Sequence, residues 1–487
     1  MLQSFLSIVF IYLIGLALLK SVNSKLSVAE SIGFSFPIGI GIITFCMFLL
    51  NLSGILLTSG ILLICNSVLV IALFCYLGVR KKMNIFYFVR DYYRNNTFKS
   101  FIAKQNIGTL LIILAIGYLT YLVGVKTLFW PAIHYDTIAG YDFLAKAITR
   151  EGTINNSLFN PEYNLISYRS IYPPLFPYSF AYCYITGVSA KCIPLLFYIS
   201  ISFSFYGLLR KYVNPFLSSL GVLVLISVPE FAAQSTFLMT NMPQTAYTLI
   251  GVISFICWFQ NKGDFYINVS ILALTLGVWG RTEGVVFFLP CFFAILYRVW
   301  QNRKQIPLFK WTNLTLCFKF GAPPTFVYIV WELYLKYSLK AAELKQPFKL
   351  GVIDLDGKFD FMIKTVKEIS FNTQLYGVVI YVFFIILLIN IGLSVYKRKL
   401  QYISPLTLII IIATWCIYLA VYYQIDIHSI EVFSGYINNG YKRGLFNFLP
   451  LLLFYCFTST SIQKTIGLLY CQYNSLSKQL PEQKRKK

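Results

Sequence analysis

Long apolar runs recur along this chain, and they constrain its fold more than any other feature. The first reads FLSIVFIYLIGLALL, and comparable runs follow at short intervals through the 487 residues. A run of about 17–25 apolar residues is long enough to cross a bilayer as a helix. Only 12% of the residues are charged, about half the share of a soluble domain. The sequence therefore predicts an all-α polytopic membrane protein, because lipid-facing backbone must satisfy its own hydrogen bonds.

Counting these runs by length predicts about thirteen transmembrane helices. The eleven Cys lie mostly inside the runs without metal-type spacing, so they are interpreted as small buried hydrophobes. The first 20 residues lack the basic start and the cleavage site of a signal peptide, which favours a retained span. The predicted spans are roughly 4–20, 33–50, 54–78, 107–128, 190–209, 216–233, 241–259, 264–280, 284–300, 318–336, 376–396, 403–423 and 444–462.

The net charge of +23 is concentrated in segments that follow predicted spans. Segment 79–104 holds seven Lys/Arg against one acid, residues 397–399 are all basic, and the chain ends in KRKK. Loops rich in Lys and Arg stay on the cytoplasmic side. Threading the spans through these loops predicts a multi-pass cell-membrane protein with its N-terminus outside and its C-terminus in the cytoplasm. Membrane topology thus explains the charge, and no nucleic-acid partner is predicted.

The threaded topology also predicts the segments that lie outside the membrane. Residues 129–189 form a large first outer loop containing interfacial helices. Within it, YPPLFPYSFAYCYITG (172–187) is too short to cross, and three Pro interrupt its start, so we expect an interfacial or re-entrant helix. The predicted division is a three-helix membrane extension with a basic cytoplasmic loop (1–104), a membrane core (105–336), an outer cap loop (337–375), and C-terminal membrane helices with a basic cytoplasmic tail (376–487).

Ionisable residues are nearly absent from the centres of the predicted spans. Asp136 lies in the first outer loop, and four further charged residues fall at the outer ends of spans: Glu230, Arg281, Glu332 and Arg443. Membrane-embedded charges are costly and usually functional. Their common level therefore indicates chemistry at the outer interface rather than conduction through the midplane.

The order of several short motifs carries a family resemblance. FWPAIHYD is followed by GYDFLAKAI, YPPLFPY, a span ending in RTEG, and a late YKRGLFNFLP. This order resembles the GT-C clan of membrane glycosyltransferases, within it the bacterial branch related to protein O-mannosyltransferases and aminoarabinose transferases. The resemblance implies that a sugar moves from a polyprenyl-phosphate carrier to an acceptor hydroxyl of a glycan, lipid or protein on the extracytoplasmic side, and that 105–336 is a GT-C-like core.

One position departs from the pattern of that clan. Related sequences often carry Asp-x-Pro at the start of the span that corresponds to 241–259, whereas this chain has Asn241 there. A second acid is therefore missing from that place, and the nearby Glu230 is the candidate to supply it.

Asp136 is the candidate catalytic base. A carboxylate at the outer face can accept the proton of an acceptor hydroxyl as its oxygen attacks the anomeric carbon, through a transition state that resembles an oxocarbenium ion. The alternative is that Asp136 only caps the helix that follows it. Asp142 and Lys146, spaced i,i+4, are interpreted as a surface pair that contributes little.

Arg281 and Arg443 are candidates to bind the phosphate of the donor. A guanidinium stays charged and matches phosphate oxygens with two parallel donors; the alternative is that these side chains reach towards lipid headgroups. Tyr172, Pro173 and Pro174 are predicted to shape the groove through which the carrier enters, or to anchor the chain at the interface.

Two further possibilities stay open in the sequence. His134 and His428, with acids nearby, could bind a divalent metal as cofactor, although two His in outer loops can also arise by chance. A surface-polysaccharide polymerase or ligase, and a lipid-linked sugar transporter or flippase, are the competing functions. Charge-free span centres and the lack of an evident inverted repeat argue against an ion-coupled transporter.

Overall fold

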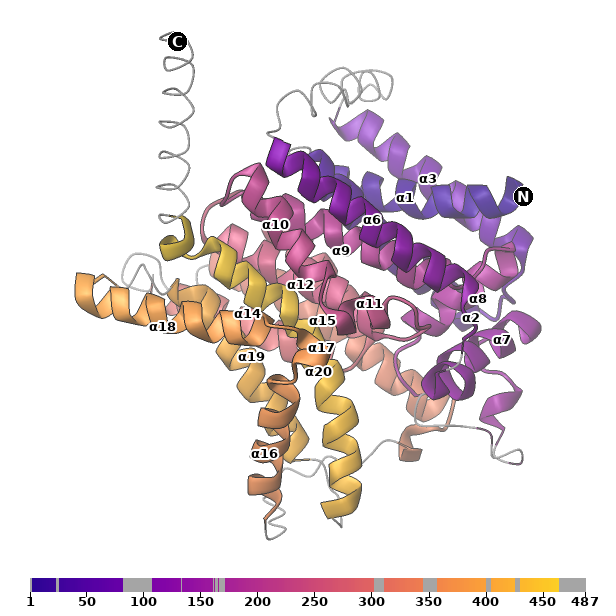
Figure 1. Ribbon diagram of the computed structural model, residues 1–487. Coiled ribbons are helices and arrows are strands. Elements are labelled where there is room, and N and C mark those ends of the chain that lie inside the picture. Colours follow the sequence, from indigo (N-terminus) through magenta and orange to yellow (C-terminus); the bar gives the residue numbers. More distant parts are fainter. Residues whose placement is uncertain are drawn as a thin grey trace, which may run out of the picture.

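The computed structural model describes residues 2–22, 26–81, 107–132, 134–160, 162, 165, 171–301, 311–344, 357–399, 404–424 and 430–463. Every regular element within these ranges is a helix, and none of them is a strand (Figure 1). The all-α fold expected from the apolar runs is thereby confirmed.

Ten helices of the described chain are long and apolar enough to cross a membrane. Each one coincides with a predicted span, so the multi-pass character is confirmed. They are α1 (Leu2–Val22), α2 (Val28–Leu52), α3 (Ser59–Lys81), α6 (Ile107–Phe129), α9 (Cys192–Leu209), α12 (Asn241–Phe259), α14 (Gly284–Gln301), α15 (Trp311–Tyr337), α18 (Val379–Lys397) and α19 (Pro405–Tyr423).

The other three predicted spans lie on helices of a different kind, so a count of thirteen is not confirmed. The span 264–280 lies on α13 (Tyr266–Gly280), which has only 15 residues. The span 216–233 is divided into α10 (Pro215–Ile226) and α11 (Pro229–Gln234), because Pro229 lacks an N–H and cannot continue a helix. The span 444–462 lies on α20 (Ile430–Thr458), whose first half carries polar and charged residues.

The segment 172–187 forms α8 (Leu175–Thr186), a helix of 12 residues. It is about 18 Å long, well short of the roughly 30 Å of a hydrocarbon core, in agreement with the expectation that it does not cross. Its side chains are buried on all sides, and the Tyr178 hydroxyl donates to Asn51 Oδ1 on α2 at 2.7 Å. The burial favours the re-entrant alternative over a helix lying on the membrane surface.

The N-terminal helices are packed onto the rest of the chain. A Cβ added to Gly39 on α2 would lie 1.8 Å from the carbonyl oxygen of Ile11, so glycine permits the close approach of α1. On its other side α2 contacts α9, and the Tyr247 hydroxyl donates to the carbonyl of Pro37 at 2.8 Å. The basic loop predicted to follow these helices lies almost entirely outside the described residues.

The predicted cap segment contains the 3-10 turn Ala342–Leu344, α16 (Lys358–Ser370) and α17 (Thr373–Tyr376). Figure 1 shows α16 beside the first half of α20, where both project from the main body of helices. Lys358 begins α16 with its ammonium donating to the carbonyl of Tyr423 at 2.8 Å. This contact joins the start of the cap helix to the end of α19.

The helix ends fall into two groups according to which ends contact each other, and this grouping agrees with the threaded topology. In one group, the Leu57 N–H donates to the carbonyl of Gly152 at 2.7 Å, and Ser4 Oγ donates to the carbonyl of Gly187 at 3.1 Å. In the other group, Lys211 pairs with Glu30 at 3.1 Å. All pairs join residues that threading places on the same side. Which group faces the cytoplasm remains a prediction.

Candidate active site

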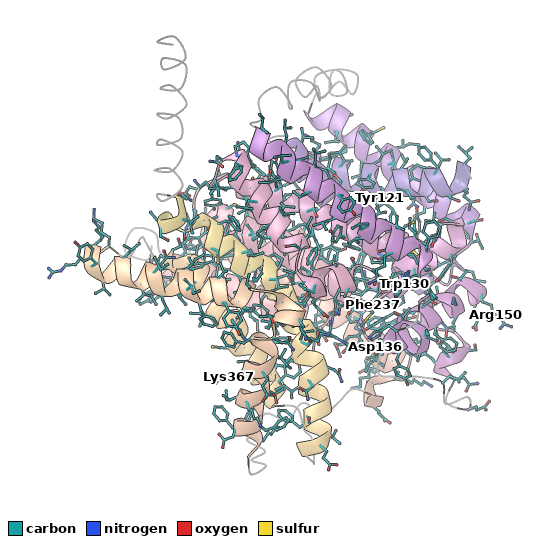
Figure 2. All side chains as sticks on the ribbon, viewed as in Figure 1. Tyr121, Trp130, Asp136, Arg150, Phe237 and Lys367 are labelled. Carbon is teal, nitrogen blue, oxygen red and sulfur yellow. The ribbon has the colours of Figure 1, made fainter. Side chains whose placement is uncertain are left out.

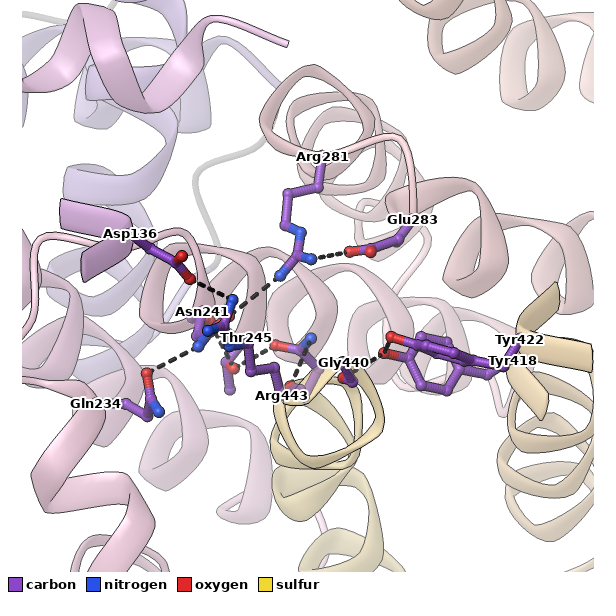
Figure 3. A network of polar contacts seen from close by, with 11 residues as sticks. Asp136, Gln234, Asn241, Thr245, Arg281, Glu283, Tyr418, Tyr422, Gly440 and Arg443 are labelled. Carbon is purple, nitrogen blue, oxygen red and sulfur yellow. Dashed lines mark hydrogen bonds and ion pairs between the residues drawn. The ribbon is translucent and has the colours of Figure 1, made fainter. Parts of the chain in front are cut away.

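Asp136 is buried, and its side chain does not cap a helix. It directly precedes a π-helical turn (Thr137–Tyr141), its own backbone is helical, and its carboxylate makes no capping hydrogen bond. Instead, Asp136 Oδ2 forms an ion pair with Arg443 Nη1 on α20 at 2.5 Å (Figure 3). A capping residue would accept an N–H from the following turn, so the capping alternative is wrong. Short π-helical turns are frequent at functional sites.

The loop before Asp136 is held in place by an aromatic contact. The imidazole of His134 packs on Phe237 with ring centroids 5.1 Å apart, and its Nδ1 accepts the backbone N–H of Asp136 at 3.2 Å. Figure 2 shows Asp136 and Phe237 next to each other, and Thr137 Oγ1 donates to the carbonyl of Leu238 at 3.3 Å. The segment 237–238 thus positions the carboxylate from one side, while α20 contacts it from the other.

Arg281 ends α13 with extended backbone, φ −152° and ψ 141°, and its guanidinium is buried. Nη2 pairs with Glu283, Nη1 donates to Asn241 Oδ1 at 3.1 Å, and the guanidinium lies 5.5 Å from the ring centre of Tyr172. Nε is buried and has no hydrogen-bond partner among the described residues. Burial opposes the positive charge, but Glu283 and the neighbouring tyrosines raise the pKa of Arg281 on balance. It therefore stays charged.

Glu230 lies in the same network, at the start of α11. Its Oε2 pairs with Lys442 Nζ at 3.2 Å, and its Oε1 accepts from Gln234 Nε2 at 2.5 Å. Gln234 Oε1 in turn accepts from Asn241 Nδ2 at 2.8 Å. Each oxygen of the carboxylate thus has its own partner, Lys442 or Gln234. The role of Glu230 as a second acid stays a prediction.

The candidate site contains three acid–base pairs, namely Asp136–Arg443, Glu230–Lys442 and Glu283–Arg281. Lys442 and Arg443 are adjacent on α20, and successive helical residues point about 100° apart, so they reach different acids. Thr245 Oγ1 on α12 also donates to Asn447 Oδ1 on α20 at 2.7 Å. Helices distant in sequence therefore meet at one level, with acidic and basic charges in balance.

Four tyrosines surround the pair of Arg281 and Glu283: Tyr141, Tyr172, Tyr418 and Tyr422. Burial raises the pKa of Tyr141 to about 12, so its phenol remains a hydrogen-bond donor at physiological pH. The hydroxyls of Tyr418 and Tyr422 are 3.1 Å apart. Tyr418 also packs so closely on α20 that a Cβ on Gly444 would lie 1.6 Å from its hydroxyl oxygen.

The residues predicted for the carrier groove have unequal environments. The half-buried Tyr172 contacts Arg281, as just described, and its ring centre lies 6.2 Å from that of Tyr141. Pro173 and Pro174 are buried, and Pro174 directly precedes the first residue of α8. Tyr172 thus belongs to the site, whereas the two prolines set where α8 begins.

The metal hypothesis rested on two histidines. His134 contacts Phe237 and the Asp136 backbone, and His428 lies outside the described residues. Within the described part of the chain, no group of three or more His, Cys, Asp or Glu residues is arranged to hold a metal ion. A divalent metal therefore stays a prediction that depends on His428.

The interpretation of Asp142 and Lys146 as a surface pair needs correction. The two side chains form the expected i,i+4 ion pair at 2.7 Å, but Asp142 is only 7% exposed, against 61% for Lys146. The Tyr184 hydroxyl on α8 also donates to the Asp142 carboxylate. Asp142 is buried because α8 packs over α7 (Asp142–Glu151), which i,i+4 spacing alone does not reveal.

Sequence reasoning missed Glu283, Lys442 and Gln234 and did not anticipate that Asn241 would contact Arg281. Glu283 and Lys442 each stand within two residues of a predicted arginine, in RTEG and YKRG. That proximity was a usable signal for both. Gln234 lies in an ordinary apolar context, FAAQST, and nothing in the sequence marks it.

No protein-family model, no curated protein and no solved structure matches this chain. The functional interpretation therefore rests on the residues of the site and on their geometry.

Proposed function

We propose that the protein is an integral membrane glycosyltransferase that moves a sugar from a polyprenyl-phosphate carrier to an acceptor hydroxyl on the extracytoplasmic side. One observation carries the proposal: the buried carboxylate of Asp136 is paired with Arg443, in one polar network with the buried Arg281, whose Nε–H has no partner among the residues that the structure describes. Glycosyl transfer from a lipid phosphate needs a base for the acceptor and cations for the leaving group.

In the proposed reaction Asp136 is the general base. The acceptor hydroxyl gives its proton to the carboxylate while its oxygen forms a bond to the anomeric carbon. The bond from that carbon to the carrier's phosphate oxygen breaks, and its electron pair leaves with the polyprenyl phosphate. Arg281 and Arg443 stabilise the charge that develops on this phosphate. A metal at His134 and His428 is not required by this scheme.

The ion pair between Asp136 and Arg443 suggests how the base is controlled. A carboxylate held by a guanidinium has a lowered affinity for protons and is a weaker base. The side chain of Arg443 is 27% exposed, so a phosphodiester that approaches it can draw the guanidinium away from Asp136. Arg281 is only 8% exposed and is held by Glu283, so it serves as the fixed cation of the pair.

The positions of the buried charges favour an enzyme over an ion-coupled transporter. Asp136 and Arg281 lie in one network (Figure 3), and Glu230 is joined to it through Gln234 and Asn241. The buried Glu30 lies with Lys211 in the opposite group of helix ends. An ion-coupled transporter normally holds its coupling residues near mid-bilayer. A polymerase or ligase of surface polysaccharides would share the chemistry of this site, and its glycan acceptor would identify it.

The test uses purified protein and a panel of polyprenyl-phosphate sugars. We expect acceptor-dependent release of free polyprenyl phosphate from at least one donor, and its loss in Asp136→Asn. If no donor is cleaved, while vesicles containing the protein move a lipid-linked sugar between leaflets, the protein is a flippase and the proposal is wrong.

A further inference from the structure

A chain of hydrogen bonds runs from Lys442 to Arg281, and the reaction proposed above does not account for it. Arg281 Nη1 donates to Asn241, and Asn241 donates to Gln234 (Figure 3). Gln234 in turn donates to Glu230. Lys442 pairs with the far oxygen of Glu230. Gln234 and Asn241 are 7% and 0% exposed. Two neutral amides are thus buried between a carboxylate and a guanidinium.

The direction of this chain is fixed by the groups at its two ends. A carboxylate only accepts hydrogen bonds and a guanidinium only donates them. Gln234 must therefore turn its NH₂ group to Glu230 and its oxygen to Asn241. Asn241 must then turn its NH₂ group to Gln234 and its oxygen to Arg281. Reversing either amide would bring like groups together, so Glu230 dictates an orientation that reaches the guanidinium two side chains away.

The consequence for Arg281 concerns its Nε–H, because both Nη atoms already have a partner. Its Nη atoms are engaged by Asn241 and Glu283, and its face lies over the ring of Tyr172. The Nε–H is buried and has no partner within the described part of the chain. A buried donor without an acceptor is unfavourable, so the arrangement suits a ligand that brings an acceptor oxygen to this atom.

We propose that Gln234 and Asn241 form an amide relay, anchored by Glu230 and Lys442, that orients Arg281 Nε–H towards the phosphate of the donor. All four are positioning residues, because they act through Arg281 and do not contact the donor themselves. The proposal rests on the proposed function and adds a specific role for the residues around its fixed cation.

The relay also explains why an amide suits position 241 better than an acid. An Asp at this position would offer only acceptor oxygens, so Gln234 Oε1 would face another oxygen without a hydrogen between them. It would also give Arg281 a second carboxylate next to Glu283. Asn241 supplies one acceptor and one donor, which continues the relay and leaves the site neutral.

The experiment exchanges the donor and the acceptor of the hydrogen bond between Gln234 and Glu230. The readout is the Kd for polyprenyl phosphate in detergent, with the KM for a cleaved donor as the second readout. Gln234→Glu places two acceptors face to face, so we expect the Kd to rise roughly 10-fold or more, because a hydrogen bond to a charged group is lost. The double variant Glu230→Gln/Gln234→Glu restores a donor at 230 and an acceptor for Asn241 Nδ2. We expect it to recover most of the affinity.

A matched control is available in another buried amide. Asn390 on α18 is 0% exposed and donates to the Tyr455 hydroxyl at 3.1 Å, away from Arg281. Asn390→Ala is expected to leave the Kd for polyprenyl phosphate unchanged, although it also removes a buried hydrogen bond. Thermal unfolding and size exclusion of each variant show that the folded protein is compared.

The outcomes separate the relay from the proposed function. Recovery in the double variant supports the relay, whereas a double variant as weak as Gln234→Glu would show that Glu230 does not direct Arg281. If the wild type binds polyprenyl phosphate but transfers no sugar, the proposed function fails and the variants still decide the relay by Kd. If the wild type does not bind polyprenyl phosphate, the relay proposal is overturned as well.

Discussion

Two buried ionic clusters can be compared among the residues that the structure describes, one around Glu30 and the other around Asp136 and Arg281. They differ in how fully their polar atoms are bonded. Glu30 is 0% exposed. Its carboxylate accepts the backbone N–H of Ser27 at 2.8 Å and the Ser27 hydroxyl at 2.6 Å. It also accepts the Tyr266 hydroxyl and pairs with Lys211. The cluster completes a capping box at the start of α2, and both carboxylate oxygens of Glu30 have partners.

The second cluster keeps capacity for a ligand. Arg281 Nε has no partner among the described residues, and the partly exposed Arg443 is the ion-pair partner of Asp136. Glu30 is more deeply buried than Asp136, yet its contacts indicate that it stabilises the fold and takes no part in a reaction. Burial of a charge is therefore a weaker indicator of function than the hydrogen bonds that the charge leaves unmade.

Asp136→Asn is expected to have the largest effect, and it tests most directly whether the cluster around Asp136 and Arg281 differs in role from the cluster around Glu30. Asn keeps the size of the side chain but loses the basic carboxylate, so sugar transfer should fall by roughly 100- to 10,000-fold, with folding intact. The measurement is release of polyprenyl phosphate by purified protein of verified thermal stability. Transfer at the wild-type rate would remove Asp136 from the catalytic role.

Glu30→Ala should act on stability alone. It removes the Glu30 half of the capping box of α2 and leaves Lys211 without its buried partner, which costs about 3 kcal/mol in the free energy of unfolding. Unfolding in detergent measures this loss. The Kd of the folded fraction for polyprenyl phosphate should stay at the wild-type value, and a weakened Kd with unchanged stability would contradict the distinction between the clusters.

Gly444→Ala should disturb the turn of α20 that carries Arg443. The added Cβ would meet the Tyr418 hydroxyl at 1.6 Å, so Tyr418 or the helix must shift, at a cost of roughly 1–3 kcal/mol. Reduced thermal stability and reduced transfer are expected together. Gly392→Ala on α18 is the control, because a Cβ there has no heavy atom within 4 Å, and it should be neutral or slightly stabilising.

Asp142→Asn should have the smallest effect and sharpens the comparison with Asp136. Asn can still accept the Tyr184 hydroxyl, and the lost partner Lys146 is largely exposed, so stability should fall by no more than about 1 kcal/mol. Transfer should be unchanged in the same assay. A loss comparable to that of Asp136→Asn would extend the catalytic site to α7.

The sequence by itself determined the helical membrane fold and the level at which the candidate site lies. Runs of apolar residues dictate helices because each run must bond its own backbone in lipid. Threading those runs through the basic loops placed Asp136, Glu230, Arg281 and Arg443 at one level, and the structure brings all four into one network. This part was predictable because span length and loop charge are local properties of the chain.

Only the tertiary structure decided which charges pair and which remain available. Helices such as α9 and α13 are apolar on every side, so their periodicity does not show which face packs inward. The pairing of Arg443 with Asp136, the burial of Asp142 beneath α8, and the insertion of Gln234 and Asn241 between Glu230 and Arg281 depend on helix rotation and depth. Those are set by packing between segments distant in the chain, and no local pattern encodes them.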